Sequence, residues 1–251
     1  MTMFEPDFRG ARVRPSPNYG ERLGCTAPDM IILHYTGMAT GEAAEDLLCA
    51  PESQVSSHYL VYEDGAVVQM VREADRAWHA GKSFWAGLND INSHSVGIEI
   101  VNPGHALGYC DFPEPQIEAV IRLCRDIATR HGVAPVRILA HSDVAPGRKI
   151  DPGEKFPWSR LEAAGVGLAA PSGPSSEAEP CGPDLVLQTQ QALAFWGYGI
   201  EPTGVEDEQT RVVVEAFQRH FMPARIDGRV DPAVLAVIQN LLGSRPPTQV
   251  S

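Results

Sequence analysis

Three short runs of mostly apolar residues have the pattern of strands buried on both faces. They are residues 30–33 (MIIL), 95–101 (SVGIEIV) and 136–140 (VRILA). A nearly continuous apolar run of this length is typical of strands in a sheet that helices cover on both sides. Residues 58–62 and 66–70 instead predict a β-hairpin, because an Asp-Gly turn separates them.

Helical spacing of apolar residues is clearest over residues 114–131. Pro115 stands near the start of this segment and Gly132 follows its end, which is the usual distribution of these two residues at helix ends. Shorter helices are expected over residues 41–50 and from Trp158 onwards. With the strands and the hairpin, this pattern predicts an α/β fold in which helices flank a mixed central sheet.

A change of composition divides the chain. Residues 168–184 are rich in Pro, Gly, Ser and Ala and have no periodic apolar pattern, as expected of a linker. We therefore expect a first domain over residues 1–167 and a second, smaller domain over residues 185–251. The second domain should contain three small helices, over residues 186–196, 209–221 and 232–242.

Composition narrows the classes of partner. The 251 residues carry a formal net charge of −12, so a broad basic face for nucleic acid or an anionic membrane is not expected. No apolar run approaches the roughly 20 residues of a membrane span. The five cysteines include no CxxC pair, which argues against a disulfide framework or a thiolate zinc site.

Candidate chemistry lies at the ends of the predicted strands. His34 ends the first buried strand, His141 ends the third, and Asp151 follows ten residues after His141. Two imidazoles and one carboxylate are a recurrent ligand set for catalytic zinc. A histidine at a strand end is more often an ordinary hydrogen-bonded residue, and spacing alone does not choose among the eight histidines.

Two further charged residues belong to this picture. Pro146 and Pro152 disfavour a helix or a central strand between them, so this segment should be a loop. In an extended segment, side chains two residues apart point the same way. Lys149 and Asp151 should therefore face one site. Glu99 lies inside the second apolar strand. Burial raises the pKa of a carboxyl group, which suits a general base, but Glu99 could equally face solvent or pair with a structural arginine.

Five segments together resemble a known family. IILHYT, SSHYLVYEDG, AWHAGKSFWAG, NSHSVGIEIVNPG and AHSDVAPGRKIDPGEKFPW occur in this order and are similar to segments of the type-2 zinc N-acetylmuramoyl-L-alanine amidases. This superfamily includes T7 lysozyme and the peptidoglycan recognition proteins. The resemblance covers roughly residues 10–165, and its last segment is the most specific.

The resemblance implies three zinc ligands, two catalytic groups and two residues of a loop near the substrate. These are His34, His141 and Asp151 for Zn2+, Glu99 as general base, Lys149 as the cation beside the oxyanion, and Trp78 and His79 in the loop. The implied reaction is hydrolysis of the amide between the lactyl group of N-acetylmuramic acid and L-alanine. A non-catalytic muropeptide-binding module and a zinc peptidase acting on the stem peptide are the alternatives.

The second domain is similar to a three-helix peptidoglycan-binding module. Val186-Leu187-Gln188 and Trp196-Gly197-Tyr198 follow that pattern, whereas Thr203-Gly204-Val205 departs from it. The alternative is a helical domain that only covers the first domain and binds no ligand. The expected partners are peptidoglycan or muropeptide fragments, and we expect a monomer. Because the N-terminal stretch lacks the apolar segment of a signal peptide, we expect a cytoplasmic protein, although a peptidoglycan-binding module would favour the cell envelope.

Overall fold

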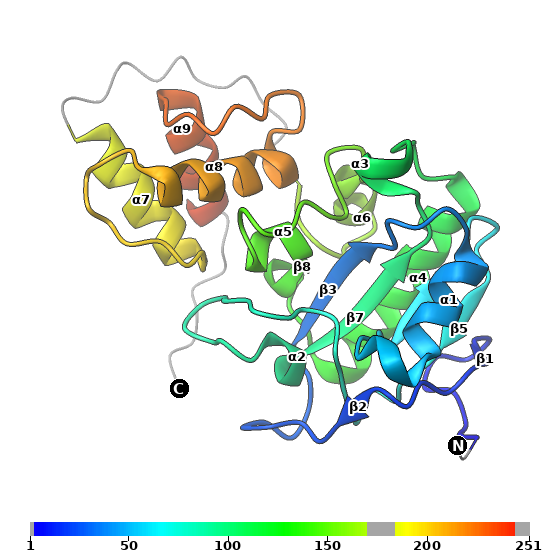
Figure 1. The fold of residues 1–251 in the computed structure, drawn as a ribbon. Helices are drawn as coiled ribbons and strands as arrows, with labels where there is room; N and C mark the ends of the chain where they lie inside the picture. The colour runs from blue at the N-terminus through cyan, green and yellow to red at the C-terminus, as the bar shows by residue number, and fades with distance from the viewer. Residues whose placement is uncertain (1–2, 170–183, 244–251) are drawn as a thin grey trace.

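A mixed sheet forms the centre of the computed structural model, which describes residues 3–169 and 184–243 (Figure 1). The strands are β1 (Arg12–Val13), β2 (Tyr19–Gly20), β3 (Met30–Tyr35), β4 (Tyr59–Val61), β5 (Val67–Gln69), β6 (Arg76–Ala77), β7 (Ser95–Ile100) and β8 (Ile138–Ala140). Six of them make one sheet in the order β1-β5-β4-β7-β3-β8, and β2 pairs with β6 separately.

Within the six-stranded sheet, the strand pairing is parallel except within the hairpin, and the separate β2–β6 pair is antiparallel. β4 and β5 run antiparallel, and Gly65 donates its N–H to the carbonyl of Tyr62 in the turn between them. The other neighbours in the large sheet are parallel. This confirms the expected mixed sheet. β1, β2 and β6 were not expected, because a strand of two residues is too short to leave an apolar pattern.

The longest helix begins and ends where the sequence predicts. The helices are α1 (Gly41–Cys49), α2 (Ile91–His94), α3 (Gly104–Leu107), α4 (Glu114–His131), α5 (His141–Val144), α6 (Trp158–Ala163), α7 (Leu185–Trp196), α8 (Glu208–Phe221) and α9 (Pro232–Gly243), with 3-10 turns at Pro51–Ser53 and Pro135–Arg137. Gly132 ends α4 in the left-handed conformation. Within the described ranges, no helix is both long and apolar enough to cross a membrane.

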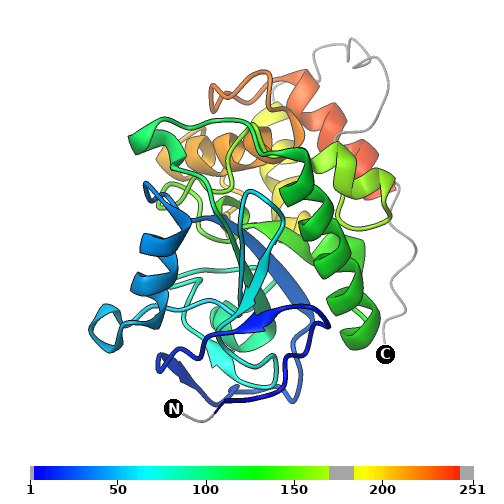
Figure 2. The same cartoon turned by 90° about the vertical axis from the view of Figure 1, so that its right-hand side faces the viewer.

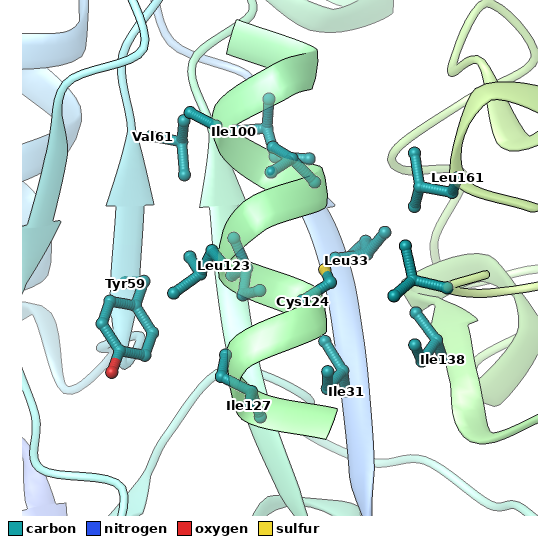
Figure 3. Packing of buried hydrophobic residues seen from close by; sticks show 14 of the residues in the cluster. Ile31, Leu33, Tyr59, Val61, Ile100, Leu123, Cys124, Ile127, Ile138 and Leu161 are labelled. Carbon is teal, nitrogen blue, oxygen red and sulfur yellow. The ribbon is translucent and has the colours of Figure 1, made fainter. Parts of the chain in front are cut away.

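Helix α4 covers one face of the sheet. Alternate residues of a strand point to opposite faces, and Ile31 and Leu33 of β3 point toward α4. They pack with Leu123, Cys124 and Ile127 on the apolar side of that helix (Figure 3). The periodic apolar pattern of residues 114–131 is therefore the buried side of α4.

Two different groups of helices cover the opposite face. Helix α1 packs over the hairpin, where Leu48 meets Leu60 and Val68. The C-terminal helices pack over the other side of the sheet, on Met30 and Ile32 of β3. Figure 2 shows α1, in blue, and α4, in green, on opposite sides of the sheet. A cleft lies between α1 and the loop of residues 148–151, over β3 and β7.

The C-terminal helices do not have a core of their own. Leu193 and Phe217 belong to the same buried cluster as Met30, Ile32 and Trp85 of the sheet region. The three helices expected from the sequence are present, but they bury their apolar sides against the sheet as well as against one another. Most of the expected linker, residues 170–183, lies outside the described residues, so the domain boundaries remain a prediction.

A shared core predicts that the sheet region and the C-terminal helices unfold together. Phe217 is fully buried in the shared cluster, so Phe217→Ala should lower the free energy of unfolding by about 3–5 kcal/mol. Thermal melts followed by circular dichroism and by tryptophan fluorescence should shift together. Phe195→Ala is the matched control, because Phe195 is 74% exposed. Two separate transitions would contradict a shared core.

Candidate metal centre and catalytic cleft

Parallel pairing brings the two candidate histidines to one edge of the sheet. His34 is the fifth residue of β3, and His141 follows β8 directly. Since β3 and β8 are parallel neighbours, both side chains lie at the carboxyl ends of their strands, where open α/β sheets bind ligands. Asp151 returns to the same place because its carbonyl accepts a hydrogen bond from the N–H of Ser142.

Three side-chain atoms from these residues converge. His34 Nδ1 lies 2.8 Å from His141 Nδ1 and 3.1 Å from Asp151 Oδ2, and His141 Nδ1 lies 3.0 Å from Asp151 Oδ2. All three residues are buried. Ligands bound 2.0–2.1 Å from a tetrahedral zinc ion lie about 3.3 Å apart, so the three atoms need to move apart by only a few tenths of an ångström to complete a site. The residues fit a zinc ion.

Hydrogen bonds on the far side of each imidazole orient it toward the common point. His141 Nε2 lies 3.1 Å from the carbonyl oxygen of Ala80, which can only accept. His34 Nε2 lies 3.0 Å from His79 Nδ1. When each Nε2 carries the proton, both Nδ1 lone pairs are free to bind a metal. Partners of this kind fix the tautomer and orientation of histidine ligands.

His79 has a second contact that fixes its own ring. Its Nε2 lies 3.2 Å from Ser95 Oγ, which donates in turn to the carbonyl of Ile91 at 2.6 Å. The ring lies against the backbone of Gly97, where a Cβ would come within 2.5 Å of it. The family resemblance implied that His79 belongs to a loop near the substrate. The structure adds a contact with the candidate ligand His34, which no sequence pattern indicated.

The electrostatics keep the His34 imidazole neutral and the Asp151 carboxylate ionised. Burial, followed by the neighbouring His141, lowers the pKa of His34 to about 4. Burial acts to raise the pKa of Asp151, but the two imidazoles outweigh it and hold that pKa well below its usual range. Neutral imidazole and ionised carboxylate are the forms that bind metal ions.

Glu99 stands beside this cluster. It pairs in register with His34 across the parallel strands β7 and β3, so both side chains point to the cleft face. Its Oε2 is buried and has no hydrogen-bond partner within residues 3–169 and 184–243. Burial, and then the charge of Asp151, raises the pKa of Glu99 well above its usual value, while Lys149 acts to lower it. No arginine pairs with it among these residues, contrary to one of the two sequence interpretations.

The cleft above these groups has a volume of about 440 Å³ and two different walls. Leu47, Leu48 and Val55 supply an apolar wall, whereas Arg148 and Lys149 supply a cationic one. Trp78 and His79 also line the cleft, as do all three candidate ligands. The sequence did not predict the apolar wall. Apolar residues of α1 that line the cleft cannot be told apart, in the sequence, from apolar residues that pack into the core.

A buried His-His-Asp set at the floor of a cleft, beside a carboxylate without a hydrogen-bond partner in the described part of the chain, is the arrangement of a metal-dependent hydrolase. Residues 24–154 match the family model described as N-acetylmuramoyl-L-alanine amidase, and residues 183–238 match that of a peptidoglycan binding domain. The chain belongs to the N-acetylmuramoyl-L-alanine amidase family.

Relatives that match most of this chain and relatives that match a shorter part of it are both found. The N-acetylmuramoyl-L-alanine amidase AmiD of Escherichia coli is 35% identical, over 85% of this chain and 82% of its own. Its structure in complex with anhydro-N-acetylmuramic acid-L-Ala-D-gamma-Glu-L-Lys has a TM-score of 0.77 over 92% of both chains. AmpDh3 of Pseudomonas aeruginosa, in complex with anhydromuramic pentapeptide, has a TM-score of 0.74 at 30% identity, over 94% of this chain and 97% of its own. The 1,6-anhydro-N-acetylmuramyl-L-alanine amidase AmpD of E. coli is 33% identical, over 61% of this chain and 90% of its own.

The close approach of His79 to β7 predicts a specific cost at Gly97. Gly97→Ala should lower the free energy of unfolding by about 1–3 kcal/mol, since the added methyl group would overlap the imidazole. Removing that ring as well, in Gly97→Ala with His79→Ala, should recover part of the loss.

Gly20→Ala is the control for this prediction, because the nearest side-chain atom is 4.0 Å from the added Cβ. Denaturant titration measures all four proteins, including the unmodified one. A Gly97→Ala protein as stable as the Gly20→Ala protein would show that His79 is not packed against β7.

Proposed function

We propose that this chain is a zinc-dependent hydrolase of the amide between the lactyl group of N-acetylmuramic acid and L-alanine. The observation that carries the proposal is the convergence of three ligand atoms within 2.8–3.1 Å of one another, next to Glu99, whose buried Oε2 has no hydrogen-bond partner among the described residues. Family membership supports the choice of this bond, because the related AmiD was solved with a substrate that contains it.

His34, His141 and Asp151 would hold the zinc ion. When bound, zinc supplies a Lewis acid that lowers the pKa of a water molecule and polarises the scissile carbonyl. The contacts of His34 with His79 and of His141 with Ala80 leave both Nδ1 atoms directed at the ion. The three residues therefore need little rearrangement on metal binding.

Glu99 would move the proton. It lines the cleft, its Oε2 has no competing hydrogen bond from any described residue, and its raised pKa makes it a stronger base than an ordinary glutamate. It can accept a proton from the attacking water and deliver that proton to the amine of L-alanine as the amide bond breaks. A base whose pKa lies near the working pH performs both steps best.

Lys149 would stabilise the negative charge that develops on the carbonyl oxygen. It lines the cleft beside Asp151 and carries no ion pair among the described residues, so its ammonium group can face the substrate. A donor aimed at a developing oxyanion typically contributes about 3 kcal/mol. Trp78 and His79 line the same cleft, and we assign Trp78 to substrate contact.

We assign peptidoglycan or muropeptide fragments as the substrate class and the helices after residue 184 as a unit that contacts the polymer. The match of residues 183–238 to a peptidoglycan binding domain supports this division, with the boundary at residues 168–184.

We also propose a cytoplasmic monomer. The free thiols of Cys25, Cys49, Cys110 and Cys124 support a reducing compartment, and cell fractionation with gel filtration is the test.

Mass analysis of the products from a defined muropeptide tests the proposed reaction. The account predicts two products, the free muramic acid sugar and the intact stem peptide with an L-alanine amino terminus. Cleavage inside the stem peptide would instead identify a peptidase. Binding without any cleavage by the zinc-loaded protein would identify a binding module.

The ligand assignment predicts that metal content and activity fall together. Alanine at His34, His141 or Asp151 should remove most of the zinc that elemental analysis finds in the unmodified protein, because two protein ligands hold the ion too weakly. His94→Ala is the matched control, since His94 is not part of the cluster. Full zinc occupancy in His141→Ala would overturn the assignment.

Glu99→Gln separates the chemistry from metal binding. Glutamine keeps the size of the side chain but cannot accept the proton, so zinc content should be unchanged while kcat falls by about 10²–10⁴-fold. Turnover near the rate of the unmodified protein would show that Glu99 has only a structural role.

A further inference from the structure

A second buried carboxylate lies two residues after the candidate ligand His141, in the same short helix. Asp143 is the third residue of α5, the short helix that His141 begins, and it is fully buried. Its Oδ2 accepts the N–H of Ala140 at 2.8 Å. Its other two hydrogen bonds come from the C-terminal helices and the turn that follows α7.

Tyr198 and His220 supply those two bonds. The hydroxyl of Tyr198 donates to Asp143 Oδ1 at 2.7 Å, and His220 Nδ1 lies 2.7 Å from Asp143 Oδ2. Both residues are almost entirely buried. The ring of His220 stacks on Trp158 with 3.7 Å between ring centroids, and its Nε2 lies 3.1 Å from the carbonyl of Leu168. The carboxylate, hydroxyl and imidazole thus form one closed set of contacts.

The C-terminal helices also contact the loop that carries Trp78 and His79. The N–H of Ala86 donates to the carbonyl of Gly197 at 2.8 Å. Trp85 packs edge-on against Tyr198 and so closely against Gly197 that a Cβ there would lie 2.7 Å from the indole. The C-terminal part of the chain therefore contacts both α5, which carries His141, and the loop that carries Trp78 and His79.

Helix α5 cannot fix the position of His141 by itself. It has four residues, and a helix of one turn is unstable without tertiary contacts. We propose that Asp143, Tyr198 and His220 act as positioning residues, through which the C-terminal helices hold His141 in the geometry that binds the metal. This inference rests on the proposed zinc site. It gives the C-terminal helices a role in catalysis besides any contact with peptidoglycan.

The chain contains a comparable network that serves as a control. Glu73 is also a buried carboxylate, and Tyr59 donates to its Oε1 at 2.5 Å while His131 Nε2 lies 2.6 Å from its Oε2. Unlike Asp143, Glu73 also pairs with an arginine, Arg130. This second set contributes no residue to the cleft. Tyr59→Phe and His131→Ala therefore remove the same kinds of hydrogen bond as Tyr198→Phe and His220→Ala, away from the candidate metal.

The test measures zinc affinity by competition with a chelator, together with kcat and KM on a soluble muropeptide and a thermal melt. Tyr198→Phe and His220→Ala should each weaken zinc binding by about 10-fold and lower kcat at saturating zinc, with little change in KM. His220→Asn should restore part of both, because its amide N–H can replace Nδ1–H. The two control variants should lower the melting temperature alone.

The outcomes separate this inference from the proposed function. An unmodified protein that neither binds zinc nor cleaves the substrate would overturn the proposed function itself. If the unmodified protein does both, and the Tyr198 and His220 variants match the Tyr59 and His131 controls in zinc affinity and kcat, the positioning role is wrong. The mild Tyr198→Phe change keeps the test valid should His220→Ala fail to fold.

Discussion

The parallel pairing of β3 with both β7 and β8 is the constraint on which the site depends. It brings the carboxyl ends of three strands to one edge, with His34 on the central strand, Glu99 in register beside it and His141 just after the third. Because successive side chains alternate between faces, a slip of one residue in β7 would turn Glu99 into the core under α4. The apolar residues that fix the register thus also fix the chemistry.

The sequence predicted those features that depend on residues close together in the chain. The buried strands, the Asp-Gly hairpin and the ends of α4 are of this kind. The strand-end positions of His34 and His141 were also evident, but only the family resemblance selected them from eight histidines, since spacing does not reveal which strand ends are neighbours. His220 lies on the apolar side of α8 beside Phe217, which indicates a buried histidine in need of a partner. That partner, Asp143, is 77 residues away and could not be predicted.

The C-terminal helices show the limit of composition as a guide to domains. A Pro- and Gly-rich segment indicated two independent units, yet Leu193 and Phe217 complete a core that begins on β3. AmpD of E. coli matches 61% of this chain over 90% of its own length, so this relative is shorter than the present chain. In this chain the added helices cover apolar sheet residues and contact both segments that shape the cleft. A ligand-binding role and a structural role are therefore compatible in the same three helices.

The central claim is that one zinc ion is bound by Nδ1 of His34, Nδ1 of His141 and Oδ2 of Asp151. Anomalous diffraction from crystals grown with zinc, recorded on both sides of the zinc absorption edge, tests it most directly. The account predicts one strong peak within about 2.0–2.2 Å of these three atoms, with Glu99 beside it but not bound to it. A peak bound through Nε2 of either histidine, or bound by other residues, would contradict the account.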